Sequence, residues 1–225
     1  GKARGLAFMN SMILKHRLYD KHANVRIMIP RSVVIATDYF DDFIRLNGLK
    51  YIISQEFSDE EILSEFVSST VPARLQQELK AYIQTVRTPL AVRSSSKLED
   101  SHYQPFAGIY STYMIPYVDN GDQMLRLLLK AVKSVYASVY FATSRAYLSS
   151  SQNLISEEKM AVIIQEVCGT EQDGLFFPTF SGVARSINYY PIGDEAPADG
   201  VCNIAMGLGK LVVDGGRTLR FSPRY

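Results

Sequence analysis

The chain has 225 residues, of which 47% are hydrophobic and 21% charged, a balance typical of a globular protein rather than a disordered or fibrous one. Its net charge is +1, so no overall field favours nucleic acid or an anionic membrane. The two cysteines do not have zinc-site or redox spacing, and no apolar run approaches the ~18 residues of a membrane-spanning helix. With no apolar signal core at the N-terminus, these features predict a cytoplasmic protein with no nucleic-acid or membrane partner.

Helical periodicity and β-branched residues organise the first part of the chain. Apolar residues at helical spacing behind a glycine-containing start predict a loop that enters a helix within residues 2–18, and RIMIPRSVVIAT is typical of a strand interrupted by Pro30. A second helix is expected to begin at a cap on Thr37 or Asp38 and to stop at Asn47-Gly48.

Two further helices are indicated by their start signals. Ser58 and Glu61 form a capping-box pattern, and Pro72 suits the first turn of the next helix. Residues 1–88 are therefore predicted to form an N-terminal helical part of α+β character.

The second part, residues 89–225, is predicted to be rich in strands. PLAVRSSS resembles a short strand that ends at the polar residues 93–96, and the next strand is IYSTYMIPYV. Apolar periodicity predicts one long helix over about 122–148. Strands are then expected at KMAVIIQEV (the strand itself at about 160–167), SGVARSINYY and CNIAMGLG.

Several segments together resemble one family. In chain order they are GKARGLAFM, IPRSVVIATDYFDDFIRLNGL, AVRSSSKLEDSHYQPFAGIYSTYMI, VIIQEV followed by SGVARS, and AMGLGKLVVDGG. This order is similar to the nucleotide-binding domain of the phosphoenolpyruvate synthase and pyruvate phosphate dikinase family, from Lys2 to about Gly216. The resemblance implies an α+β, ATP-grasp-like fold in which two α/β lobes close on ATP.

Phosphate binding requires cations and hydrogen-bond donors. Arg93 follows an apolar strand, where its guanidinium could hold phosphate oxygens bidentately, with Ser94 and Ser95 as additional donors. The resemblance assigns ATP phosphates to Lys2 as well. The alternatives are a solvated Lys2 and an Arg93 paired with acidic residues at 99 and 100.

Glycines and backbone groups complete the expected nucleotide site. Gly108 allows close approach of backbone to a ligand, and Thr112 either faces the same site or simply follows a turn. Gly207 and Gly209 could form a phosphate-facing turn, although a single GxG is a weak pattern.

The adenine and ribose are assigned to a strand and the loop that follows it. The segment Gln165, Glu166 and Val167 is expected to present a carbonyl and, two residues later, an N–H to adenine. Glu171 lies where a ribose-binding acid is expected from the resemblance, and a solvated loop glutamate is the alternative.

The resemblance also implies chemistry shared with other domains. Phosphate from ATP would pass to a histidine on a separate domain and then to pyruvate, with Mg²⁺ bound by ligands beyond this chain. The chain is therefore expected to be a fragment, truncated before the metal-binding segment and inactive by itself.

Some positions depart from the family pattern. Arg185 and Ser186 replace Phe-Thr, Met206 replaces Trp, and Lys210 replaces Glu. These departures leave two alternatives open: a degenerate nucleotide-binding regulatory module, or a relative that phosphorylates a different small molecule or a glucan.

Overall fold

The computed structural model describes residues 1–53, 55–96, 110–150, 158–213 and 215–224. They form two compact units, Gly1–Val167 and Cys168–Tyr225. Within the described residues, no helix combines the length and apolarity needed to cross a bilayer.

Unit 1 is organised by a four-stranded antiparallel sheet in the order β1-β4-β2-β3. The strands are β1 (Ser32–Ile35), β4 (Met160–Glu166), β2 (Leu90–Ser96) and β3 (Thr112–Ile115). Because β2 and β4 pair along their whole lengths, they join the first ninety residues to the segment near 160 in one sheet. The compact units consequently divide after Val167, whereas the sequence placed a division after residue 88.

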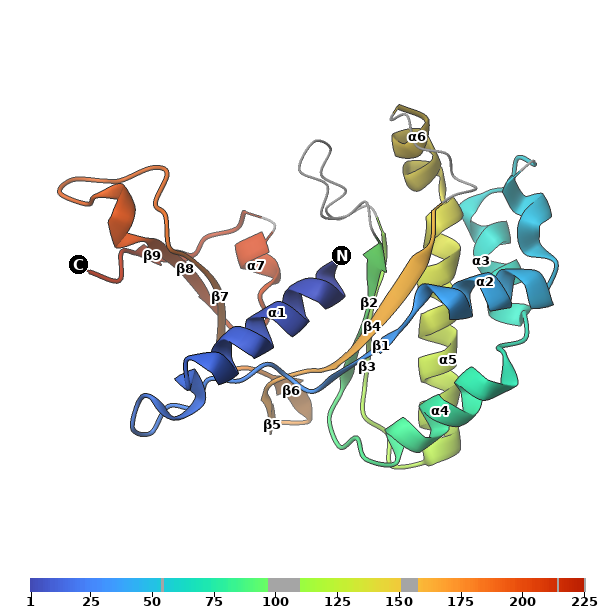
Figure 1. Cartoon of the computed structure of the whole chain (residues 1–225), viewed down its shortest axis with the longest axis horizontal. Helices are drawn as coiled ribbons and strands as arrows, with labels where there is room; N and C mark the ends of the chain where they lie inside the picture. Colours follow the sequence, from blue (N-terminus) through green and yellow to red (C-terminus); the bar gives the residue numbers. More distant parts are fainter. Residues whose placement is uncertain (54, 97–109, 151–157, 214, 225) are drawn as a thin grey trace. The chain divides into compact units, whose positions relative to one another are not determined.

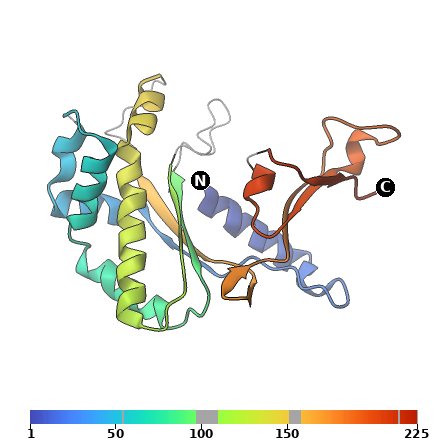
Figure 2. The ribbon, with the colours of Figure 1, turned by 180° about the vertical axis from the view of Figure 1, so that it is seen from behind.

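Helices cover one face of this sheet, as Figures 1 and 2 show from opposite sides. They are α2 (Thr37–Leu46), α3 (Asp59–Ser68), α4 (Ala73–Ile83) and α5 (Gly121–Ala137). Helix α1 (Lys2–Lys15) lies on the other side of the sheet and contacts β2. Short 3-10 helices at Leu18–Asp20, Leu49–Ile53 and Ser138–Tyr140 and helix α6 (Ala142–Ser150) complete the unit.

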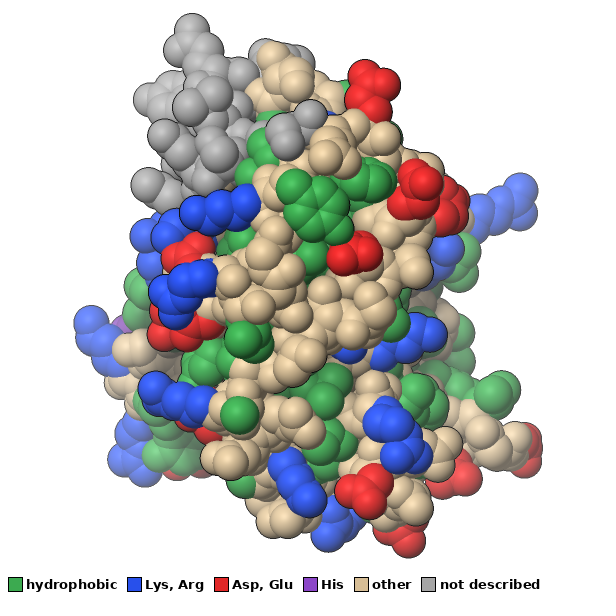
Figure 3. All heavy atoms as spheres, turned by 90° about the vertical axis from the view of Figure 1, so that its right-hand side faces the viewer, with side chains coloured by type: hydrophobic (Ala, Val, Ile, Leu, Met, Phe, Trp, Pro, Cys, Tyr) green, Lys and Arg blue, Asp and Glu red, His purple; other side chains and the backbone are tan. Residues whose placement is uncertain are grey.

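The core lies between the sheet and these helices. Phe43 of α2 packs 5.7 Å from Phe66 of α3 and 5.5 Å from Tyr136 of α5, measured between ring centroids. Burial of such aromatic rings, with Leu128 and Val132 on the same side of α5, is the main stabilisation available to the unit. Figure 3 shows the outer surface of the molecule on the side of α2 and α3. Charged side chains of both signs lie there among a few hydrophobic ones.

The helix starts follow the sequence signals in part. The predicted capping box of α3 is confirmed: Ser58 Oγ accepts from the Glu61 N–H, and Glu61 Oε2 accepts from the Ser58 N–H. The other two helix starts differ from their predictions in opposite directions, α2 beginning earlier and α4 later. Ala36 is the N-cap of α2, and Pro72 precedes α4 as its N-cap instead of occupying its first turn.

The predicted long helix over 122–148 is wrong. Helix α5 ends at Ala137, and Phe141 is extended, with φ −65° and ψ 155°, before α6 begins. Serine hydroxyls stabilise the break, because Ser138 Oγ donates to Val135 O and Ser144 Oγ donates to Ser138 O. Asp59 Oδ1 accepts the N–H of Ala142 from outside the helix, so tertiary contacts cap the second helix.

The strand PLAVRSSS also differs from its prediction. Instead of ending at its polar residues, β2 continues through Ser96, which pairs with Met160. The serines are small enough to be buried within the sheet, and their backbone groups are satisfied by β4.

Unit 2 consists mainly of two small antiparallel sheets. Strands β5 (Thr170–Gln172) and β6 (Leu175–Phe177) form a hairpin whose turn, Asp173-Gly174, has positive φ at both residues. The other sheet has the order β7 (Phe180–Arg185), β8 (Val201–Met206) and β9 (Leu219–Phe221). The short helices are the 3-10 turn Pro197–Asp199 and α7 (Lys210–Val213). Both units are thus mixed helix and antiparallel sheet, which agrees with the predicted α+β class.

Replacing Phe66 by Ala should lower the free energy of unfolding of the chain by about 3–5 kcal/mol, because it leaves a cavity among buried rings. Leu46→Ala, at an exposed position that ends α2, is the matched control and should change it by less than ~0.5 kcal/mol. Urea unfolding followed by circular dichroism measures both, and equal effects would contradict this assignment of the core.

Acid should weaken unit 2 through Glu195. Hydrogen bonds from Arg220, from the Ile192 N–H and from Asn188 lower the pKa of Glu195 to about 2. Because this pKa lies below the ordinary value of 4.5, the stabilisation is complete above pH 4.5 and is lost as pH falls toward 2. Glu195→Gln should therefore unfold more easily near neutral pH and lose less stability between those pH values than the parent chain, in urea titrations at several pH values. Glu171→Gln, on exposed β5, is the control and should follow the parent curve.

Candidate functional site

Arg93 emerges on the face of the sheet that α2–α5 leave uncovered. Its neighbour Val92 is fully buried under the helices, and side chains alternate along a strand, so Arg93 points to the opposite face. On that face Arg93 lies opposite Thr112 of β3, whose side chain is exposed. The structure therefore brings together two residues that the sequence predicted for one site.

A line of hydrogen bonds across three strands orients Arg93. Its Nη1 donates to Gln165 Oε1 over 3.4 Å, and Gln165 Nε2 donates to Ser32 Oγ over 3.2 Å. Ser32 Oγ in turn donates to Pro30 O at 2.8 Å. The hydrogen bond to Gln165 uses a donor of one terminal nitrogen of Arg93, and a guanidinium carries five N–H donors in all. The acidic residues at positions 99 and 100, its alternative partners, lie outside the described residues, as does Gly108.

Lys2 reaches the same strand from the first turn of α1. Its Nζ donates to Ser94 O at 3.2 Å and to Ser94 Oγ at 3.3 Å, and the Ala3 N–H donates to Ser95 Oγ at 3.1 Å. Both serines are buried. Their hydroxyl groups therefore hold the start of α1 against β2, and this places the lysine ammonium beside the residue that follows Arg93.

The backbone groups expected to meet adenine are engaged within the sheet. The Val167 N–H donates to Pro89 O, and the Glu166 N–H donates to Arg31 O, each at 2.9 Å. Gln165 lies between Ser32 of β1 and Ala91 of β2 in the ladder. A base could bind Val167 only if its hydrogen bond to Pro89 opened.

The Glu166 side chain joins the segments that contain Arg31 and Thr88, which the sequence did not predict. Its carboxylate forms an ion pair with Arg31 Nε and accepts from Thr88 Oγ1 at 3.0 Å, while Arg31 Nη2 donates to Thr85 O at 2.8 Å. Burial, together with the nearby charge of Glu166, raises the pKa of Tyr82 to about 12. The partners are 135 and 78 residues away along the chain, so no local pattern could have identified them.

An apolar groove adjoins this line of polar residues. It has a volume of about 290 Å³ and is lined by one face of α1 and by the segment that leads into β1, including Ile29, Pro30, Ser32 and Val34. Ser32 thus belongs both to the groove and to the hydrogen bonds that orient Arg93.

The remaining candidates belong to unit 2. Glu171 is exposed on β5. Gly207 has φ 72°, donates its N–H to Thr179 O at 3.1 Å and accepts from Ser181 Oγ at 2.7 Å. A Cβ on Gly209 would lie 3.3 Å from that of Ser181. Both glycines therefore have local conformational reasons to be there, independent of any phosphate.

No group of three or more His, Cys, Asp or Glu side chains able to hold a metal ion occurs among the described residues. What unit 1 assembles is a pair of cations, from α1 and β2, with hydroxyl and amide groups beside them.

Comparison with known proteins decides the family. A family model described as "Pyruvate phosphate dikinase, AMP/ATP-binding domain" matches residues 1–220. The chain belongs to this family. Its resemblance to phosphoenolpyruvate synthase and pyruvate phosphate dikinase, first suggested by the motifs, is thereby confirmed.

Relatives carry names that agree with the family. The chain is 28% identical over 193 residues to an uncharacterized phosphotransferase, YvkC, of Bacillus subtilis (strain 168). It is 26% identical over 214 residues to a probable phosphoenolpyruvate synthase of Staphylothermus marinus, and 24% identical over 210 residues to a phosphoenolpyruvate synthase of Aeropyrum pernix. Each match covers 84% of this chain but only 20%, 23% and 24%, respectively, of the relative. The chain thus spans less than a quarter of these proteins.

The conformational role of Gly207 can be tested by Gly207→Ala, which should destabilise unit 2 by about 1–2 kcal/mol because an alanine at positive φ is strained. Gly121→Ala, where a Cβ meets open space at the start of α5, should be neutral or slightly stabilising. Thermal unfolding of both variants is the measurement. An unperturbed Gly207→Ala would show that local strain does not explain this glycine.

Proposed function

We propose that this domain binds ATP, with the triphosphate held by Arg93 and Lys2. The observation that supports it best is that two cations from separate elements are held by hydrogen bonds at neighbouring positions of β2: Gln165 holds Arg93, and Ser94 holds Lys2. Membership of the family supports a nucleotide as the ligand of this site. The ATP-grasp type of fold is part of the same proposal.

The chemistry of each group suits a polyphosphate. The planar guanidinium of Arg93 can hold two oxygens at once, and Gln165 restricts its orientation before the ligand arrives. Lys2 adds a point charge on a flexible stem, and the Thr112 hydroxyl can donate from the neighbouring strand. In binding phosphate, Lys2 would exchange its hydrogen bonds with Ser94 for phosphate oxygens through a change of side-chain rotamer.

The base and sugar contacts extend the proposal. The backbone of Gln165–Val167 would meet adenine after the Val167–Pro89 bond opens, and Glu171 would accept the ribose hydroxyls. Mg²⁺, when bound to the nucleotide, offsets the negative charge of the β- and γ-phosphates, and its protein ligands would lie outside the described residues.

At the level of the whole protein, we propose that phosphate passes from ATP to a histidine on another domain and then to pyruvate. The names of the two synthase relatives and their greater length support this. The residues here would bind and orient the donor phosphates, and the domains that carry the histidine and bind pyruvate would supply the acceptors.

A second candidate is a regulatory module that binds nucleotide without transferring phosphate. It is favoured by Lys210, at the start of α7, where the family pattern has an acid, and by Arg185 and Ser186. A relative that phosphorylates another small molecule or a glucan would explain the same departures. Phosphorylation of the whole polypeptide by ATP labelled at both the β- and γ-phosphates, followed by transfer of label to pyruvate, distinguishes the three.

Arg93→Ala should weaken ATP binding by the chain about 10- to 100-fold, because a charged hydrogen-bonding partner of the phosphates is lost. Arg93→Lys should recover only part of the lost affinity, because lysine keeps the positive charge but lacks the planar guanidinium that can bind two oxygens at once. Isothermal titration calorimetry with ATP measures both.

The control is Arg45→Ala, which removes an exposed arginine of α2 that pairs with Asp42. It should bind ATP like the parent chain. Equal affinity of Arg93→Ala and Arg45→Ala, with both variants folded, would refute the phosphate site.

A further inference from the structure

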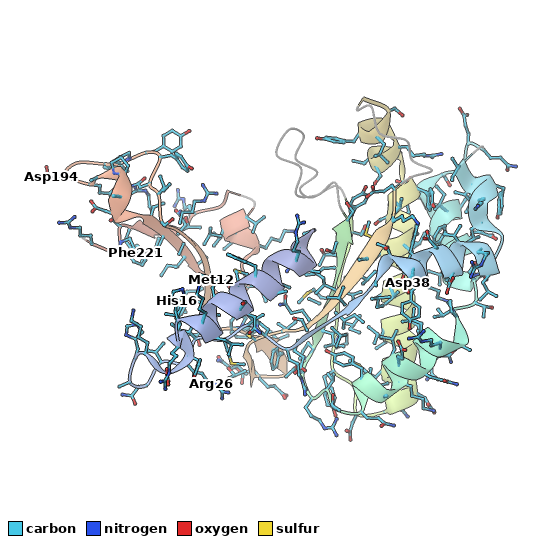
Figure 4. The ribbon with its side chains drawn as sticks, viewed as in Figure 1. Met12, His16, Arg26, Asp38, Asp194 and Phe221 are labelled. Carbon is cyan, nitrogen blue, oxygen red and sulfur yellow. The ribbon has the colours of Figure 1, made fainter. Side chains whose placement is uncertain are left out.

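Ser32 lies on the edge strand of the unit 1 sheet, on the same face as Arg93. It is the first residue of β1, the strand that leads to α2 and to Asp38 in Figure 4. In the strand register Ser32 lies opposite Gln165, and Gln165 lies opposite Ala91. Residues opposite one another share a face of the sheet, as do residues two apart along a strand. Ser32 and Gln165 therefore belong to the face that carries Arg93.

The Gln165 side chain reaches Arg93 diagonally across this face. Its direct neighbour on β2 is Ala91, whose methyl group leaves the path toward Arg93 free of a large side chain. Diagonal neighbours on a sheet are within reach of long side chains. The Gln165 amide thus lies between two partners: Oε1 accepts from Arg93 Nη1 at 3.4 Å, and Nε2 donates to Ser32 Oγ at 3.2 Å.

The two ends of this line of hydrogen bonds fix the direction in which it runs. At one end, the Pro30 carbonyl can only accept, and it receives the single hydroxyl proton of Ser32 at 2.8 Å. Ser32 Oγ then offers Gln165 only its lone pairs, so the NH₂ group of the amide must face Ser32. At the other end, the guanidinium of Arg93 can only donate, and it meets the amide oxygen. Both ends require the same orientation of the amide.

We propose that Ser32 is a positioning residue of the ATP site: its hydroxyl sets the orientation of the Gln165 amide, and the amide orients the Arg93 guanidinium for phosphate. This inference rests on the proposed binding of phosphate by Arg93. A neutral amide suits the task, because it holds the guanidinium without cancelling the positive charge that attracts phosphate. Ser32 acts on ATP only through Gln165 and Arg93.

Removal of the Ser32 hydroxyl should weaken ATP binding without removing any group that contacts ATP. In Ser32→Ala the Gln165 Nε2 loses its acceptor, so the amide is no longer held from the β1 side. Arg93 must then be ordered when ATP binds. We expect the affinity for ATP to fall about 3- to 10-fold, the effect of one hydrogen bond, when measured by isothermal titration calorimetry.

A double-mutant cycle tests whether Ser32 acts through Arg93. Ser32→Ala should weaken ATP binding in the parent chain and should have no further effect in the Arg93→Ala background, because the route to the phosphates is already cut. An equal loss in both backgrounds, or no loss in the parent chain, would overturn the proposal.

Two further variants separate positioning from a general effect on folding. Ser32→Thr keeps the hydroxyl on a residue favoured in strands and should bind ATP like the parent chain. Ser68→Ala removes an exposed serine of α3 whose hydroxyl also donates to a backbone carbonyl, that of Glu65, and is the matched control. It should leave ATP binding unchanged. Thermal unfolding confirms that each variant is folded.

The Gln165 amide gives a second readout that does not require ATP. Its two nitrogen-bound protons give a pair of NMR signals, which the Gln165→Leu variant identifies by their absence. Ser32→Ala should move this pair toward the shifts of free glutamine and speed its exchange with water, whereas Ser32→Thr and Ser68→Ala should not. An unchanged pair in Ser32→Ala would overturn the proposal, whatever the ATP affinity.

Failure of the proposed ATP site would look different. In that case Arg93→Ala would bind ATP like the parent chain, while the Gln165 signals would still respond to Ser32→Ala. That result would refute the phosphate site and with it the role of Ser32 in ATP binding, although the hydrogen bond between Ser32 and Gln165 would stand.

Discussion

The pairing of β2 with β4 is the interaction on which unit 1 depends. Seven consecutive residue pairs, from Leu90–Glu166 to Ser96–Met160, join segments that lie about seventy residues apart. The pairing creates the two faces of the sheet: one buries Val92 and Val162 under the helices, and the other presents Arg93 and Gln165. Without it, no candidate phosphate-binding group of unit 1 would have a fixed position.

Attachment of α1 to this strand follows from the same pairing. Since β4 satisfies the backbone of the three serines that end β2, their hydroxyl groups are left for other partners. Ser94 and Ser95 use them to hold Lys2 and Ala3. A segment that looks like a polar loop in the sequence is therefore both the end of a strand and the anchor of the N-terminal helix, and it holds Lys2 at the residue that follows Arg93.

Unit 2 contrasts with unit 1 because, among the described residues, few of its hydrophobic side chains are buried. One face of its small sheet carries the Arg220–Glu195 pair together with Val183 and Val201, and the other carries the exposed side chains of Phe180, Met206 and Leu219. The same alternation rule that explains Arg93 in unit 1 separates these two faces in unit 2. In both units, the strand register determines which side chains share a face of the sheet.

The amino-acid sequence by itself determined the family, the α+β class, the capping box at Ser58 and the choice of Arg93 as a candidate, because these depend on local order, spacing and side-chain chemistry. Only the tertiary structure decided that Gln165 orients Arg93, that Glu166 clamps Arg31, and that the helix predicted over 122–148 breaks after Ala137. Each of these results depends on partners far away in the chain, such as Asp59 beneath the start of α6. Periodicity and propensity describe neighbours along the chain, whereas these contacts form only after the sheet has brought distant segments together.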